Sequence, residues 1–180
     1  MPDPTNPVVI PMSVTVRSTV TEFGELSVAA RDGAVVGCQF MPADQLAQRF
    51  GGTRDDERDL AERAVAEVEA YLAGETREFA TPVRLGVSEF DNRVLAALTE
   101  RVPYGKTVSY GWLARELDLP VAASRAVGKA LAGNPVLVFV PCHRVVGSSG
   151  ALTGYAGGLQ VKRGLLDLES TPDSDDLRLF

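Results

Sequence analysis

The sequence predicts an α+β fold, with a small antiparallel sheet and one helix in the N-terminal half and mostly helices in the C-terminal half. Apolar and polar residues alternate in three runs between residues 14 and 40, and Asp32-Gly33 separates the last two runs, as expected for a β-hairpin. Apolar residues then recur at helical spacing between residues 55 and 73. Beyond residue 87, four segments have the caps or the periodicity of helices.

The predicted sheet follows an expected loose tail at residues 1–12, whose first ten positions include three prolines. We predict three strands, at residues 14–20, 26–30 and 34–40. Cys38 is expected on the same face as Val36 and Phe40, because side chains two positions apart point to one side of a strand. We therefore expect Cys38 to be a buried structural residue and not a reactive thiol.

A helix is predicted from about residue 55 to residue 73. Thr53 is placed to cap it, acidic residues crowd its first turns as the helix dipole favours, and Gly74 is a suitable stop. The inward stripe is expected to contain four apolar residues spaced four apart, namely Leu60, Ala64, Val68 and Leu72. The acidic face is interpreted as solvated surface.

Residues 75–87 lack clear periodicity and contain Pro82 and Gly86, so we place a domain boundary there. The expected organisation is an N-terminal support domain at 1–86, a C-terminal domain at 87–170 and a flexible acidic tail at 171–180.

The C-terminal half is predicted to begin with a helix that Ser88 caps and Pro103 ends. Ser109 caps a second helix at 110–117, and a third helix runs from about 122 to 132. Two short helices across a tight turn have the layout of a helix-turn-helix, at about residues 109–132. Many helix pairs that bind nothing share this pattern. The third helix is rich in small residues, which allow close approach to a neighbouring surface.

The segment Pro141-Cys142-His143-Arg144-Val145 places one of two cysteines next to the only histidine. A nucleophilic thiol needs a group that takes its proton, and histidine suits that task near neutral pH. The apolar run at 136–140 is predicted to be a strand that brings this pair to the mouth of the core. A glycine-rich loop at 153–158 then leads into a last helix that ends near Glu169. Taken alone, a Cys-His pair is more often structural than catalytic.

The net charge of −6 argues against nucleic-acid binding, but the charges are unevenly placed. Between Arg101 and Arg163 lie eight cations and two acids, a net charge of +6, whereas the remaining ten cations and 22 acids give −12. This segment is a candidate surface for a polyanion. The alternative is an ordinary set of solvated surface charges.

Length and composition indicate the class of protein, its compartment and the absence of a zinc site. A chain of 180 residues with 45% hydrophobic residues is typical of a soluble globular protein with one domain or two small ones. No apolar stretch reaches the length of a membrane span, and the N-terminus lacks a secretory signal. Two cysteines form no disulfide framework, so we expect the reducing cytoplasm. One histidine and two cysteines are too few for a zinc site.

The segment from Val102 to Glu169 resembles the O6-alkylguanine-DNA alkyltransferases, also called methylated-DNA–protein-cysteine methyltransferases. Several long motifs occur in the right order and spacing, at residues 103–110, 125–128, 134–135, 141–145, 153–159 and 162–169. The N-terminal half matches this family only in outline. The resemblance implies a ribonuclease-H-like N-terminal domain and a C-terminal domain with a helix-turn-helix and a buried active-site cysteine.

The resemblance also implies a reaction that needs no cofactor and no metal. An alkyl group passes from the O6 of guanine, or less readily the O4 of thymine, to Cys142, and the stable thioether means that each molecule acts once. His143 would be the base through a bridging water, and Glu169 would fix its tautomer. Asn134 would support the turn that presents the thiol. Tyr110 would donate a hydrogen bond or proton to the leaving guanine.

The remaining implied roles concern the base and the DNA. The flipped base would be held by the backbone carbonyls of Cys142 and Val145, the ring of Tyr155, the amide of Ala156 and the close approach that Gly157 allows. Arg125 would fill the vacated space in the stack while its helix enters the minor groove. The small residues that fit the groove are Ala126 and Gly128, and the candidate phosphate contacts are Lys106, Arg115 and Lys129. Those three cations could equally be inert surface charges.

We expect double-stranded DNA carrying O6-alkylguanine as the partner, bound by a monomer, with cooperative assembly along DNA as the alternative. Three other functions compete: a lesion-binding protein that transfers nothing, a cysteine hydrolase or acyltransferase, and a DNA-binding regulator. The presence of Cys142 disfavours the first, and the match around Tyr110 and Arg125 disfavours the second. The chain departs from the family at Leu95 and Trp112, and its turn before Arg125 is one residue longer, which could shift that helix.

Overall fold

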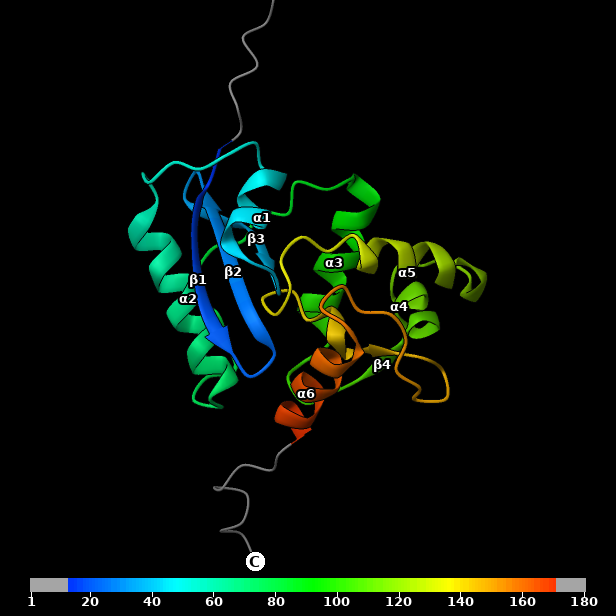
Figure 1. Cartoon of the computed structure of the whole chain (residues 1–180). Helices are drawn as coiled ribbons and strands as arrows, with labels where there is room; N and C mark the ends of the chain where they lie inside the picture. Colours follow the sequence, from blue (N-terminus) through cyan, green and yellow to red (C-terminus); the bar gives the residue numbers. More distant parts are fainter. Residues whose placement is uncertain (1–12, 171–180) are drawn as a thin grey trace, which may run out of the picture.

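The computed structural model describes residues 13–170 (Figure 1). A three-stranded sheet and two helices form the N-terminal half, and helices α3 to α6 with their connecting loops form most of the rest. The predicted combination of a small antiparallel sheet with helices is therefore confirmed. The predicted tails at 1–12 and 171–180 lie outside the described residues. Within 13–170, no helix has the length and apolar character needed to cross a bilayer.

The sheet consists of β1 (Thr15–Thr21), β2 (Gly24–Arg31) and β3 (Ala34–Gln39), antiparallel and in that order. Asp32 and Gly33 join β2 to β3 with φ values of 51° and 74°. A two-residue turn with both φ values positive matches the twist of a hairpin, so the predicted Asp-Gly hairpin is confirmed.

A β-bulge between β2 and β3 changes which residues share a face. Ala29 pairs with Gly37 and Ala30 with Val35, which leaves Val36 as the extra residue. Val36 therefore packs in a small cluster with Ala29, whereas Cys38 packs in the main core. The prediction that Cys38 shares the face of Val36 is wrong for this reason. The predicted burial of Cys38 is confirmed, with 0% of the residue exposed.

Two helices pack against this sheet. The short α1 (Ala43–Arg49) was not predicted, because it buries only Leu46 and Ala47 and has no side-chain cap. The longer α2 (Arg58–Leu72) contacts β1 and β2. Thr53 does not cap it: the helix begins after Glu57, and Thr53 pairs with Val14 instead.

The buried stripe of α2 differs from the predicted one. Ala64 and Val68 are buried as expected, but Leu60 and Leu72 are only half-buried. The stripe is completed by Ala61, Val65 and Tyr71. Tyr71, with 0% exposed, therefore points inward from the C-terminal end of the helix.

The C-terminal half contains α3 (Glu89–Arg101), α4 (Tyr110–Glu116), α5 (Ser124–Ala132) and α6 (Leu159–Ser170). The predicted caps are confirmed: Ser88 Oγ accepts from the Asp91 amide, and Ser109 Oγ accepts from the Trp112 amide. A 3-10 turn at Val121–Ala123 leads directly into α5. The two-residue strands β4 (Val108–Ser109) and β5 (Val145–Val146) pair in parallel and hold the start of α4 beside the cysteine segment.

The apolar run at 136–140 is buried but is not the predicted strand. Val138 has a φ of 73°, and the Val140 amide donates back to the Val136 carbonyl at 3.1 Å, so the chain turns within the run. The run is fixed to β3 instead, because the Leu137 amide donates to the Cys38 carbonyl at 2.8 Å. The sheet therefore supports the backbone that leads to Cys142. The division into domains stays a prediction, since one main core contains residues of both halves.

Candidate active site at Cys142

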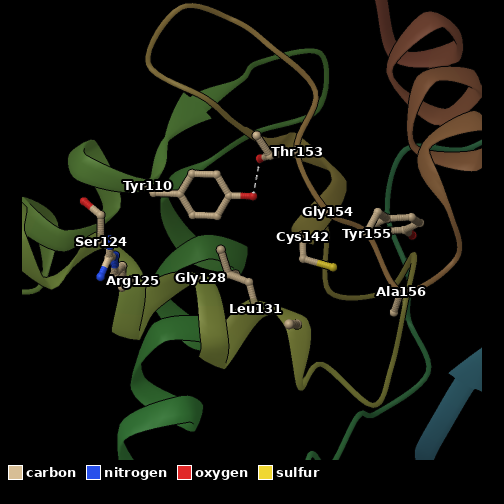
Figure 2. Close-up of a pocket in the computed structure, with 11 residues that line it drawn as sticks. Tyr110, Ser124, Arg125, Gly128, Leu131, Cys142, Thr153, Gly154, Tyr155 and Ala156 are labelled. Atoms are coloured by element: carbon tan, nitrogen blue, oxygen red, sulfur yellow. Dashed lines mark hydrogen bonds between the residues drawn. The ribbon is translucent and has the colours of Figure 1, made fainter.

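Cys142 begins a 3-10 turn, Cys142–Arg144, and is 5% exposed at the side of a pocket of about 530 Å³. Figure 2 places Tyr110 on one side of the sulfur and Tyr155 with Ala156 on the other. The pocket is lined by Tyr110, Ser124, Arg125, Gly128, Leu131, Ala132, Cys142, Thr153, Gly154, Tyr155 and Ala156. A small molecule or an extruded base could therefore reach the thiol.

Asn134 holds the turn that presents this thiol. Its side-chain amide donates to the Val140 carbonyl at 3.1 Å and to Cys142 Sγ at 3.2 Å. Its side-chain oxygen accepts from the Val136 amide at 3.0 Å. The side chain thus closes the loop between α5 and Cys142, in the position that the sequence analysis expected.

The environment of Cys142 keeps its thiol protonated at neutral pH. Burial raises the pKa of Cys142 to about 11, although the Asn134 hydrogen bond and the charge of Lys162 act in the opposite direction. A thiol with this pKa is a poor nucleophile until another group takes its proton. The site therefore needs a base close to the sulfur.

His143, the next residue in the chain, is the candidate for that base. The residue is fully buried, and its Nε2 lies 2.7 Å from Glu169 Oε1. Burial lowers the pKa of His143, against the opposing influence of Glu169, so the ring is neutral near pH 7. We assign the proton to Nε2, which donates to the carboxylate. Nδ1 is then the basic nitrogen, and it has no hydrogen-bond partner within residues 13–170.

Glu169 is the most heavily hydrogen-bonded side chain of the site. Arg144 donates to both oxygens, with Nε to Oε2 at 2.8 Å and Nη2 to Oε1 at 2.9 Å. The Gly105 amide donates to Oε2 at 3.0 Å, and the Tyr71 hydroxyl donates to Oε1. Burial alone would raise the pKa of Glu169, but the hydrogen bonds from His143, Arg144 and Tyr71 hold it at about 2. The carboxylate is therefore ionised at any physiological pH.

Position 105, whose amide donates to Glu169, requires a glycine. Its φ is +74°, and a Cβ there would lie 2.9 Å from the main-chain oxygen of Glu169. Any larger residue would push the end of α6 away from the turn.

Four polar residues of this region were missed by the sequence analysis: Gln39, Tyr71, Arg144 and Lys162. Gln39 donates to the carbonyls of Asn134 and Pro135, and buried Lys162 donates to those of Val145 (2.6 Å) and Thr153 (2.8 Å). Arg144 and Lys162 were included in family motifs and counted as cations of the basic segment, but neither was given a role at the site. Tyr71 lies three positions after Val68 and could have been included in the inward stripe of α2.

The structure brings six of the predicted residues to one pocket: Tyr110, Arg125, Gly128, Cys142, Tyr155 and Ala156. Tyr110 reaches across it, with its hydroxyl 2.7 Å from Thr153 Oγ1 (Figure 2). Val145 and Gly157 are not among the lining residues of this pocket. The Val145 carbonyl already accepts from Lys162, and a Cβ on Gly157 would lie 2.8 Å from the Tyr155 ring, so Gly157 serves packing. A substrate-binding role for these two residues stays a prediction.

The basic segment divides into buried and exposed cations. Arg144 and Lys162 are buried, and Arg101 pairs with Glu116 at 2.7 Å. The exposed cations that remain are Lys106, Arg115, Arg125, Lys129 and Arg163. Of these, Arg125 and Lys129 lie four positions apart on α5, next to the exposed Ala126. Helix α5 thus presents a positive, small-residue surface at the pocket mouth.

Comparison with known proteins finds one family model in the C-terminal half and relatives that match most of the chain. A family model described as 6-O-methylguanine DNA methyltransferase, DNA binding domain, matches residues 89–171. The methylated-DNA–protein-cysteine methyltransferase of Mycolicibacterium paratuberculosis is 43% identical over 164 residues, which cover 91% of this chain and 97% of that relative. The inducible enzyme of the same name from Bacillus subtilis is 44% identical over 147 residues, 78% of this chain and 80% of the relative.

Solved structures extend the similarity to the whole fold. Mycobacterium tuberculosis OGT in complex with DNA is 39% identical, with a TM-score of 0.77 over 87% of this chain and 93% of that one. The O6-methylguanine methyltransferase of Mycobacterium tuberculosis is 35% identical, with a TM-score of 0.76 over 91% of this chain and 98% of that one. The similarity therefore includes the N-terminal sheet, where the sequence motifs are few.

Proposed function

The chain belongs to the methylated-DNA–protein-cysteine methyltransferase family of DNA-repair enzymes, and from that premise we propose that it repairs O6-alkylguanine in double-stranded DNA by irreversible transfer of the alkyl group to Cys142. The observation that carries the proposal is a buried thiol that opens onto a pocket and is followed in sequence by a neutral, carboxylate-bound histidine. Each molecule acts once, because a thioether has no leaving group that would regenerate the thiol.

The transfer step is a displacement at carbon. The sulfur of Cys142 attacks the alkyl carbon, the carbon–O6 bond breaks, and its electron pair stays on the guanine. The thiol proton passes through a bridging water to Nδ1 of His143, whose Nε2–H remains bonded to Glu169. Glu169 stabilises the imidazolium that forms, as the acid of a nucleophile–base–acid triad does.

The leaving guanine gains negative charge and needs hydrogen-bond donors. Tyr110 is the candidate donor to a ring nitrogen, which requires its hydroxyl to turn from Thr153 toward the base. The Ala156 amide is the candidate donor to O6, and the ring of Tyr155 forms a wall of the pocket. The carbonyls of Cys142 and Val145 would select guanine by accepting from its exocyclic amine. O4-alkylthymine is a poorer substrate because thymine has no exocyclic amine.

The DNA approaches through α5. A base within a duplex cannot reach a buried sulfur, so the alkylated nucleotide is flipped into the pocket at a cost of a few kcal/mol. Arg125 lies both on α5 and at the pocket mouth, which suits it to fill the space that the base leaves. Ala126 and Gly128 allow α5 to enter the minor groove, and Lys106, Arg115 and Lys129 are candidate phosphate contacts. In this proposal α4 and α5 act as a helix-turn-helix.

Intact-mass spectrometry tests the reaction directly. The full-length protein is incubated with excess duplex that carries one O6-methylguanine, and we expect a gain of one methyl group that maps to Cys142. An unmodified duplex of the same sequence is the control. Turnover without a mass gain would favour a hydrolase, and binding without a mass gain would favour a non-transferring lesion binder. Either result would overturn the proposal.

Arg125→Ala is expected to slow transfer from duplex DNA by about thirtyfold, because the flipped state loses a contact that offsets part of its cost. Transfer from free O6-benzylguanine, which needs no flipping, should change by less than about twofold. Arg163→Ala is the matched control, since it removes another exposed cation, from α6. Rate constants for both substrates are measured for each variant. Equal losses on the two substrates would contradict the role of Arg125 in flipping.

A further inference from the structure

We infer that Tyr71 of α2 is a positioning residue for the transfer reaction: its hydroxyl fixes the Glu169 oxygen that orients His143. The inference rests on the proposed function of Cys142 and His143, and it gives the N-terminal half a part in the chemistry. Tyr71 is separated from Glu169 by 98 residues of sequence, yet its hydroxyl donates to Glu169 Oε1. The same hydroxyl lies 3.4 Å from His143 Nε2.

The two oxygens of Glu169 have different partners. Oε2 is held by Arg144 Nε and by the Gly105 amide, at 2.8 and 3.0 Å. Oε1 accepts from Arg144 Nη2, from His143 Nε2 and from Tyr71. Tyr71 and His143 therefore share one acceptor atom. Without the hydroxyl, the guanidinium could draw Oε1 further toward itself and away from the imidazole.

Tyr71 itself is held rigidly. It is fully buried, and its ring packs against Phe79 at 5.3 Å and edge-on against Tyr104 at 5.9 Å between centroids. Burial, together with the charge of Glu169, raises the pKa of Tyr71 far above its ordinary value. The hydroxyl thus stays protonated and can only donate to the carboxylate. A rigid donor of this kind fixes its acceptor in one place.

Among the ionisable groups near His143, Tyr71 is the one that belongs to the N-terminal half. The ionisable groups that act on the imidazole are Glu169 and Lys162 of α6, Arg144 of the adjacent 3-10 turn, Tyr155 of the glycine-rich loop and Tyr71 of α2. Four of these five come from residues 144–169. Helix α2 and helix α5 lie at opposite sides of the view in Figure 1, and Tyr71 connects α2 to Glu169 and His143.

The test compares Tyr71→Phe with Tyr104→Phe in the full-length protein. Phenylalanine keeps the ring and its packing but removes the hydroxyl. The Tyr104 hydroxyl contacts the main-chain carbonyl of Leu168 at 3.4 Å and not the carboxylate, so Tyr104→Phe controls for the loss of a neighbouring hydroxyl. Each variant is assayed for transfer from free O6-benzylguanine and for affinity for unmodified duplex DNA.

A second readout follows His143 directly. The chain has a single histidine, so ¹⁵N-histidine labelling gives NMR signals from this ring alone. Their chemical shifts report which nitrogen carries the proton. This measurement needs neither DNA nor a reaction, and it remains informative even if the proposed transfer fails.

We expect Tyr71→Phe to slow transfer about tenfold at unchanged DNA affinity and to lower the population of the Nε2–H form of His143. Tyr104→Phe should leave both properties as in the original chain. Wild-type ¹⁵N shifts and wild-type transfer in Tyr71→Phe would overturn the inference. Equal changes in the two variants would overturn it as well, because they would indicate a general packing effect. If the unsubstituted protein transfers nothing, the proposed function fails while the ¹⁵N comparison still decides the positioning role.

Discussion

Replacement of Cys142 by alanine is expected to abolish methyl transfer, a loss of more than about 1000-fold, because no other group at the pocket can form the thioether. Binding to DNA should persist, since the cations and small residues of α5 are untouched. The fold should persist too: the Asn134 amide loses Sγ but keeps the Val140 carbonyl at 3.1 Å. Intact-mass spectrometry with an O6-methylguanine duplex measures transfer, and fluorescence anisotropy measures binding.

Cys38→Ala is the matched control for this substitution. It removes the other thiol of the chain, which lies in the core and has a pKa raised far above the ordinary value by burial alone. We expect this variant to accept a methyl group as the original chain does. If transfer survives in Cys142→Ala and is lost in Cys38→Ala, the acceptor is Cys38 and the proposal for Cys142 is wrong. Loss of DNA binding in Cys142→Ala would show that the substitution damaged more than the nucleophile.

The proposed reacting pair, Cys142 and His143, could be selected from the sequence because its signals are local. Cys142 and His143 are adjacent, and the Asn134 amide that bonds the sulfur lies eight positions away. Serine caps likewise depend on a span of four consecutive positions, which is why the starts of α3 and α4 were found. Asp32-Gly33 sets its own turn for the same reason. Contacts within a few residues need no knowledge of the tertiary fold.

Three of the wrong predictions depend on neighbours that are distant in sequence. The apolar run at 136–140 looks like a strand, but β3 satisfies part of its backbone and Val138 turns the rest. The bulge at Val36 shifts one residue to the other face, and no residue type marks it. Thr53 has the chemistry of a cap, yet the pairing with Val14 places it outside the helix.

The number of cations that the basic segment exposes could not be predicted from its sequence. Arg144 and Lys162 add to the positive charge counted from the sequence. In the structure both are buried and donate hydrogen bonds to internal acceptors. Buried cations are rare unless paired, so composition alone assigns them to the surface. Five exposed cations of the segment remain after the buried pair and Arg101 are set aside. Arg144, counted in the charge of that segment, is instead a buried partner of Glu169.

That pairing predicts a large effect for Glu169→Gln. The amide keeps the shape of the side chain but removes the anion that buried Arg144 and the Nε2–H of His143 both need. Because the imidazole loses its anionic partner, transfer should fall by about two orders of magnitude or more. The variant should also be less stable at pH 7 by about 3 kcal/mol, since the buried guanidinium loses its anionic partner and keeps neutral acceptors such as the Val102 carbonyl. Glu100→Gln, an exposed position on α3, is the control for loss of one acid.

The loss of stability in Glu169→Gln should depend on pH, with a sign set by the lowered pKa. The pKa of Glu169 is about 2 in the folded protein against an ordinary 4.5, so ionisation stabilises the fold fully above pH 4.5. This contribution disappears as the pH falls toward 2, because the protonated acid resembles glutamine. The difference in unfolding free energy between the two proteins should therefore be largest at pH 5–7 and should shrink steadily between pH 4.5 and pH 2. Urea unfolding at a series of pH values measures it. A difference that stays constant down to pH 2.5 would mean that the Glu169 charge contributes nothing to holding Arg144 and His143 in place.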